Sequence, residues 1–174
     1  MPSSAPARPA PNEFFEYYGK YIALVPDGDV RAHLERQNAE TAKFITSRGD
    51  AWAKSRYAPG KWSPKEVIGH VTDAERIFAY RALRIARNDK TALAGFEEND
   101  YVPIAGADAR SVADLLDEFA AVRVASARLF RSFDEAAWSR RGTASGKEIT
   151  ARALAFITAG HELHHLKILR ERYV

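Results

Sequence analysis

Hydrophobic residues recur at intervals of three and four positions in four long stretches of the chain, which is the period of a helix with one buried face. The second stretch has the clearest start, because Ser63, Pro64 and Glu66 supply an N-cap, a proline in the first turn and a capping-box glutamate. Four amphipathic helices of this length predict an all-α fold, a four-helix bundle. The predicted helices cover residues 30–48, 63–87, 111–132 and 149–172.

The connection between the second and third helices determines the predicted topology. Residues 88–110 contain several glycines, prolines and asparagines and predict a long crossover. A chain of that length reaches roughly 75 Å when extended, against about 35 Å for one helix of the bundle. The second and third helices can therefore run parallel, and the fourth is then antiparallel to the second. No β-sheet is predicted anywhere in the chain.

The N-terminal part of the chain differs in composition from the rest. Residues 1–12 are rich in proline, serine and alanine and are predicted to form a disordered tail. The aromatic residues 13–25 predict a short helix or a strap across the bundle, and residues 13–174 are predicted to form a single domain. The start of the chain lacks the apolar core of a signal peptide, and no run of about 18 apolar residues occurs. We therefore expect a cytoplasmic protein that does not bind membranes.

Composition and charge exclude several kinds of chemistry. The chain has no cysteine, so it has no disulfide, no thiolate metal site and no nucleophilic thiol of its own. Its 26 basic and 23 acidic residues give a formal net charge of +3. Such a small excess of positive charge predicts no nucleic-acid partner.

Three of the five histidines lie within residues 161–165. His161 and His165 are four positions apart and share one helical face, the spacing by which a single helix binds a metal through two imidazoles. His70 lies on the buried stripe of the second helix, at a similar depth if the second and fourth helices are antiparallel. The three histidines predict a metal site with open coordination positions. The alternative is that they are polar groups of the core.

Two carboxylates near these histidines are candidates for catalysis. Glu162 completes an HExxH pattern, in which the glutamate of a zinc protease acts as general base. The extended metzincin pattern fails, because Ile168 and Glu171 occupy the positions of its glycine and histidine. Asp73 follows His70 by one turn, so it either orients that imidazole ring or is an ordinary surface carboxylate.

Three arginines follow one another at intervals of three positions on the second predicted helix, namely Arg81, Arg84 and Arg87. They form either a cationic edge for an anionic substrate or a solvated face. His164 is predicted to pack beside the metal site, because it cannot point at the same metal as both His161 and His165.

These blocks of sequence resemble the DinB/YfiT-like superfamily of metal-binding four-helix-bundle proteins. The resemblance covers about residues 30–172 and rests on the segments 60–76, 96–98 and 159–165. It implies a homodimer with a long crossover. It also implies a divalent metal ion, zinc before nickel or iron, with three ligands that map onto His70, His161 and His165.

The resemblance also implies a reaction, because characterised relatives include transferases that join low-molecular-weight thiols such as bacillithiol or mycothiol to electrophiles, and a thiol-dependent isomerase. A metal with an open position would lower the pKa of such a thiol. The expected function is therefore a metal-dependent S-transferase for a small-molecule substrate, with Arg81 or Arg84 as candidates to bind the thiol cofactor. One alternative is a metal-dependent hydrolase in which Glu162 or Asp73 activates bound water. Another is a metal-binding stress-response protein without turnover.

Overall fold

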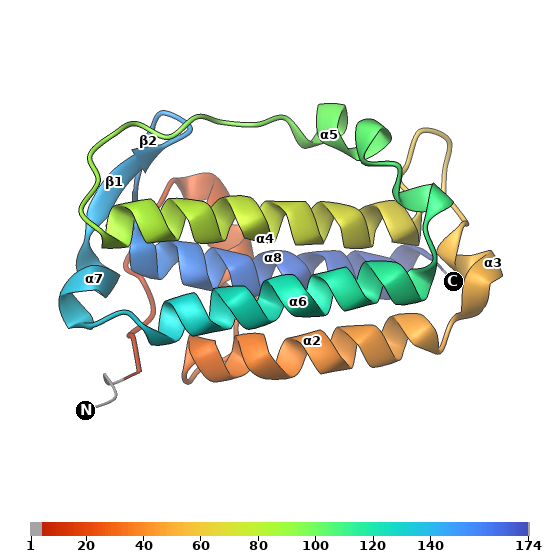
Figure 1. Cartoon of the computed structure of the whole chain (residues 1–174), viewed down its shortest axis with the longest axis horizontal. Helices are drawn as coiled ribbons and strands as arrows, with labels where there is room; N and C mark the ends of the chain where they lie inside the picture. Colours follow the sequence, from red (N-terminus) through yellow and green to blue (C-terminus); the bar gives the residue numbers. More distant parts are fainter. Residues whose placement is uncertain (1–4, 174) are drawn as a thin grey trace.

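The computed structural model describes residues 5–173 and is built around a bundle of four long helices (Figure 1). Helices α2 and α8 run in one direction, and α4 and α6 run in the opposite direction. The predicted all-α four-helix bundle is confirmed, with its second and fourth long helices antiparallel. The long helices are α2 (Val30–Thr46), α4 (Pro64–Ala86), α6 (Val112–Arg131) and α8 (Ala151–Arg172).

The crossover between α4 and α6 runs along the length of the bundle, so that these two helices are parallel (Figure 1). It carries α5 (Glu98–Ala105) and a 3-10 turn, η3 (Ala107–Ala109), where the sequence predicted an irregular connection. A further short helix, α3 (Gly49–Ala53), lies between α2 and α4. The crossover meets the rest of the chain through an isolated bridge between Leu93 and Ala144.

Capping side chains fix where the helices begin. The Ser63 hydroxyl accepts a hydrogen bond from the Glu66 N–H, and the Glu66 carboxylate accepts one from the Ser63 N–H. This reciprocal pair is the capping box predicted for α4. Ser111 caps α6 in the same position, and Thr150 caps α8.

A β-hairpin precedes α8, so the prediction of a chain without strands is wrong. Its strands pair in antiparallel register from Arg141 opposite Thr150 to Ala144 opposite Lys147. Four-residue strands around a polar turn are too short for an alternating pattern to be recognised in the sequence. The elements of this region are α7 (Glu135–Ser139), β1 (Arg141–Ala144) and β2 (Lys147–Thr150).

The N-terminal segment lies against the bundle. Arg8 donates hydrogen bonds to two backbone carbonyl groups of the following segment, at 2.7 and 2.6 Å. The Glu13 carboxylate is buried and accepts from the Thr150 hydroxyl at 2.9 Å. Residues 5–12, which the sequence predicts as part of a disordered tail, thus make polar contacts with the rest of the chain through Arg8. Residues 1–4 of that tail lie outside the described residues.

The aromatic segment crosses the outside of α8, as the predicted strap requires. Its closest approach is at Gly160, where a β-carbon would lie 2.0 Å from the carbonyl oxygen of Tyr21. A glycine in the middle of α8 therefore allows the strap to pack on this helix. The segment consists of two 3-10 turns, η1 (Pro11–Glu13) and η2 (Glu16–Tyr18), and the helical turn α1 (Gly19–Ile22).

Replacing Gly160 with alanine is expected to lower the free energy of unfolding by about 2 kcal/mol, because the new methyl group overlaps backbone atoms that cannot rotate away. Gly19→Ala is the matched control, since a β-carbon there meets its nearest atom at 3.7 Å, an ordinary contact. Urea unfolding followed by circular dichroism measures both. Equal stability of the two variants would contradict the close approach.

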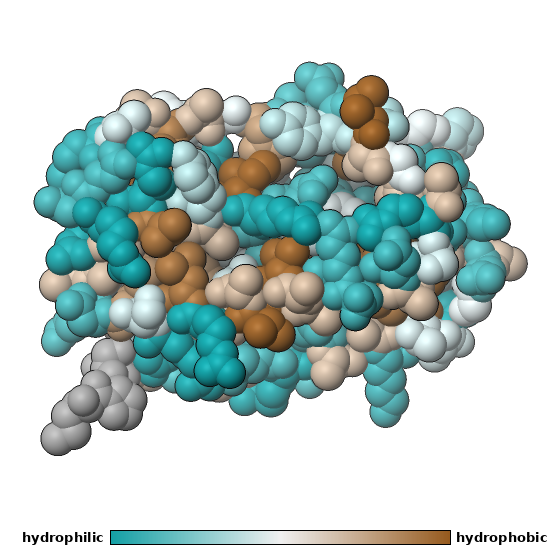
Figure 2. All heavy atoms as spheres, viewed as in Figure 1, coloured by the Kyte–Doolittle hydropathy of each residue, from teal (hydrophilic) through white to brown (hydrophobic). Residues whose placement is uncertain are grey.

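Two clusters of buried hydrophobic side chains form the core, and a layer of buried polar residues crosses the bundle between them. Hydrophilic side chains cover much of the face over α4 and α6, with smaller hydrophobic patches between them (Figure 2). Within residues 5–173, no helix combines the length and the apolar character needed to cross a lipid bilayer. The polar layer includes Gln37, Thr41, His70, Glu75, Arg123, His161 and Glu162.

Candidate metal centre

Three histidine side chains converge between α4 and α8. The Nε2 atom of His161 lies 3.1 Å from Nε2 of His70 and 3.1 Å from Nε2 of His165. The potential ligand atoms of all three residues lie within 4.8 Å of one another. The antiparallel packing of α4 and α8 thus brings the three histidines predicted from spacing and depth to one place.

These distances fit a metal ion held by three imidazoles. Nitrogen ligands at about 2.0–2.1 Å from a tetrahedral metal are about 3.3 Å apart, close to the two separations of 3.1 Å from His161. Imidazole is a good ligand for zinc, iron, nickel and copper alike, so the donor set selects a divalent transition metal rather than magnesium or calcium. Three protein ligands leave at least one coordination position for a substrate.

Burial keeps these histidines in the neutral form that binds metals. Burial lowers the pKa of His70 to about 4. The pKa values of His161 and His165 are held well below the ordinary value, first by burial and then by repulsion from the neighbouring imidazoles. No proton has to be displaced from these rings at neutral pH before a metal can bind.

Aromatic rings enclose the histidine cluster. The ring of Trp62 lies 4.8 Å from that of His70, and the rings of Tyr21 and Phe78 stand edge-on to His161 at 5.3 and 5.6 Å. Phe78 lies on the same buried stripe of α4 as His70, as its helical spacing from His70 predicts. Trp62 had a weaker signal, since a hydrophobic residue just before an N-cap often packs on the first turns of its helix. The sequence contains no comparable signal for Tyr21.

The two candidate carboxylates do not reach the cluster. Asp73 is partly exposed and accepts a hydrogen bond from Arg76 at 3.3 Å. Glu162 is buried and accepts from Arg123 at 2.8 Å and from the Thr41 hydroxyl at 2.6 Å. Burial raises the pKa of Glu162, while Arg123 and Thr41 oppose that effect. Neither carboxylate joins the group of potential metal ligands, and both are hydrogen-bonded to other side chains.

Two larger cavities border the cluster, beside a small one of about 20 Å³ that is lined by His165 and Glu162. A cavity of about 90 Å³ is lined by His70, His161 and Arg81. A second one, of about 230 Å³, is lined by His165. Arg84 lines neither of these two cavities.

The remaining candidates make contacts away from the metal ligand atoms. Arg84 pairs with Asp89 on the surface. The His164 ring packs edge-on against Tyr21 at 5.1 Å and against His165 at 5.2 Å. His164 thus packs beside the cluster, as its spacing predicted.

Comparisons with known proteins agree with this architecture. A model of the DinB superfamily matches residues 33–169. The structure of YfiT from Bacillus subtilis, described as a probable metal-dependent hydrolase with an unusual four-helix bundle topology, matches with a TM-score of 0.74. The match has 16% sequence identity and covers 95% of this chain and 90% of that one, which shows a common fold. A search of curated proteins found no match.

Proposed function

The chain belongs to the DinB superfamily, and from this premise we propose that it is a divalent-metal-dependent enzyme that transfers a low-molecular-weight thiol to a small electrophile. The convergence of three neutral imidazole nitrogens, 3.1 Å apart in two pairs, carries the proposal. Residues that serve only as core polar groups have no need to direct all three Nε2 atoms at one point. The two adjoining cavities give small molecules access to that point.

The residues around the cluster favour a thiol as the nucleophile. A bound divalent metal would supply a Lewis acid that lowers the pKa of a thiol or of water. A free thiol has a pKa of about 8.5 and water one of about 15.7, so the thiol needs less help from a base. No Asp or Glu of residues 5–173 joins the histidine group as a further ligand. The chain has no cysteine, so the sulfur must come from a co-substrate.

Hydrolysis is the second candidate, because YfiT, which shares this fold, is described as a probable metal-dependent hydrolase. The sequence offered Glu162 or Asp73 as the base in such a reaction. Glu162 accepts hydrogen bonds from Arg123 and Thr41, and Asp73 accepts one from Arg76. Hydrolysis at this site would therefore proceed without a base from either position.

Metal analysis of protein purified without a nickel column tests the site. About one divalent metal ion per chain is expected in the wild type and none in His70→Ala, because two imidazoles of one helix bind far more weakly than three. His33→Ala is the matched control, since His33 lies on α2 and contacts Asp27 and Arg36. Metal-free wild type, or metal retained by His70→Ala, would overturn the assignment.

Turnover assays then separate the candidate reactions. Glutathione and cysteine with chlorodinitrobenzene test S-transfer, and nitrophenyl acetate without thiol tests hydrolysis. S-transfer above the uncatalysed rate, lost in His70→Ala, supports the proposal. Ester hydrolysis alone supports the second candidate, and a bound metal with neither activity across a wider panel supports a non-catalytic protein.

A further inference from the structure

Arg81 is a buried cation that has no carboxylate partner among the described residues. Arg81 is only 3% exposed. Its Nη2 donates hydrogen bonds to the carbonyl oxygen of Ala94 at 2.7 Å and to the hydroxyl oxygen of Ser145 at 3.0 Å. Arg123, which is 2% exposed, pairs instead with two glutamates. A buried charge without an ion-pair partner is unfavourable. The Arg81 guanidinium lies over the Phe96 ring at 5.9 Å, and Glu98 lines the same cavity without forming an ion pair with it.

Arg81 lines the same cavity as the histidine cluster. It follows His70 by eleven positions on α4, which is three turns, so both side chains lie on one face about 16 Å apart at their α-carbons. Helical side chains point back toward the N-terminus, which directs the guanidinium toward His70. Ala74 and Phe78 lie between them along the cavity. The cavity thus has imidazole nitrogens and a guanidinium separated by an apolar wall.

Ser145 supplies a second hydrogen-bond donor to this cavity. Its hydroxyl oxygen accepts from Arg81, which leaves its own O–H hydrogen free to donate. Ser145 and Gly146 form the hairpin turn with φ values of 52° and 73°, a turn that favours asparagine, aspartate or glycine at both positions. A serine held in the left-handed region with its hydroxyl at a cavity is a feature often found at functional sites.

We propose that Arg81 and Ser145 form a carboxylate-binding subsite, so that the small molecule acted on at the metal centre is an organic anion with its carboxylate remote from the reacting atom. A single negative charge fits better than a phosphate dianion, because Glu98 lines the same cavity. The role of the metal end rests on the proposed function, whereas the carboxylate subsite depends only on residues of this chain.

Binding of hexanoate and of hexanol to the full chain tests the subsite, with dissociation constants measured by calorimetry before and after treatment with a chelator. Hexanoate is expected to bind the wild type about tenfold more tightly than hexanol. The preference should disappear in Arg81→Gln and persist in Arg84→Gln, the matched arginine one turn later. Ser145→Ala changes a residue on the exposed turn and should reduce the preference for hexanoate. This variant tests the subsite if Arg81→Gln does not fold. The subsite is overturned if the wild type binds the two probes equally, or if Arg81→Gln and Ser145→Ala keep the preference for hexanoate. It is also overturned if the wild type loses that preference after chelation.

Cobalt-loaded protein separates this inference from the proposed function. Mercaptohexanoate and mercaptohexanol both carry a thiol. If the thiol binds the cobalt ion, a sulfur-to-cobalt absorption band appears and measures binding. The carboxylate compound should give the band at about tenfold lower concentration in the wild type, and Arg81→Gln should abolish the difference. Failure to bind cobalt, with the hexanoate preference intact, would overturn the metal function alone. Cobalt binding without any preference for carboxylate would overturn the subsite alone.

Discussion

Replacing Arg123 with methionine is expected to lower the free energy of unfolding by about 3–5 kcal/mol, because it leaves two buried carboxylates without their cation. Arg123 on α6 donates to Glu75 on α4 at 2.9 and 2.7 Å and to Glu162 on α8 at 2.8 Å. The three side chains are at most 3% exposed. Methionine preserves much of the length and the helix propensity of arginine, so the change removes the charge and its hydrogen bonds with little loss of packing.

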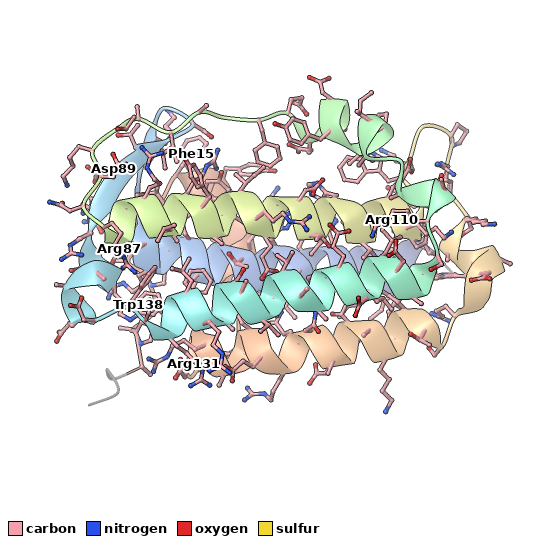
Figure 3. The ribbon with its side chains drawn as sticks, in the orientation of Figure 1. Phe15, Arg87, Asp89, Arg110, Arg131 and Trp138 are labelled. Atoms are coloured by element: carbon pink, nitrogen blue, oxygen red, sulfur yellow. The ribbon has the colours of Figure 1, made fainter. Side chains whose placement is uncertain are left out.

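Urea unfolding measures this loss, with Arg131→Met as the matched control. Arg131 lies near the end of α6, beside the start of α2 (Figure 3), and pairs with Glu35. Both side chains of that pair are substantially exposed, so its removal should have a much smaller effect. A triple variant with Arg123→Met, Glu75→Gln and Glu162→Gln should recover part of the stability, since it removes the unpaired charges as well. Equal losses for Arg123→Met and Arg131→Met would contradict the buried network.

This network also determines how the metal ligands meet. Glu162 directly follows His161, and Glu75 lies five positions after His70 on α4. Because Arg123 pairs with both glutamates, it fixes the position of α4 relative to α8 along the helix axes. Thr41 on α2 donates to Glu162 and joins the remaining long helix to the network. The charges that cross the core therefore hold the two halves of the histidine cluster level with each other.

The role of Glu162 could not be predicted from the sequence. Helical spacing correctly places His161 and His165 on one face of α8, and the depth argument correctly brings His70 to them. The same spacing shows only that Glu162 points elsewhere. Its partner Arg123 lies 39 positions away, and such a long-range ion pair leaves no local pattern in the sequence. The HExxH match therefore predicts a base, whereas the structure places Glu162 in the polar layer of the core.

The different burial of the three arginines on α4 could not be predicted from the sequence either. Arg81, Arg84 and Arg87 look equivalent in the sequence, yet Arg81 is buried while Arg87 is exposed. The difference arises because the crossover and the hairpin turn cover α4 at Arg81, through Ala94 and Ser145. Neither element has a strong periodic pattern, so the burial of one arginine in the row depends on contacts that local propensity does not encode.

Adding zinc to metal-free wild type is expected to raise the free energy of unfolding by about 4 kcal/mol once free zinc exceeds its dissociation constant about 1,000-fold. The reason is that only the folded chain brings His70, His161 and His165 together. Thermal or urea unfolding with and without zinc measures the gain. No zinc-dependent change in the wild type would contradict a metal site at these residues.

The variant His161→Leu distinguishes metal ligands from polar groups of the core. If the histidines are ligands, this change abolishes the zinc effect. The metal-free protein should stay within about 1 kcal/mol of the wild type, because leucine fills a buried site well and the lost hydrogen bonds join rings that border cavities. If the imidazoles instead hold the core together, the metal-free variant loses stability and zinc has no effect on either protein. His161 contacts both other rings, so its replacement gives the clearest separation of these outcomes.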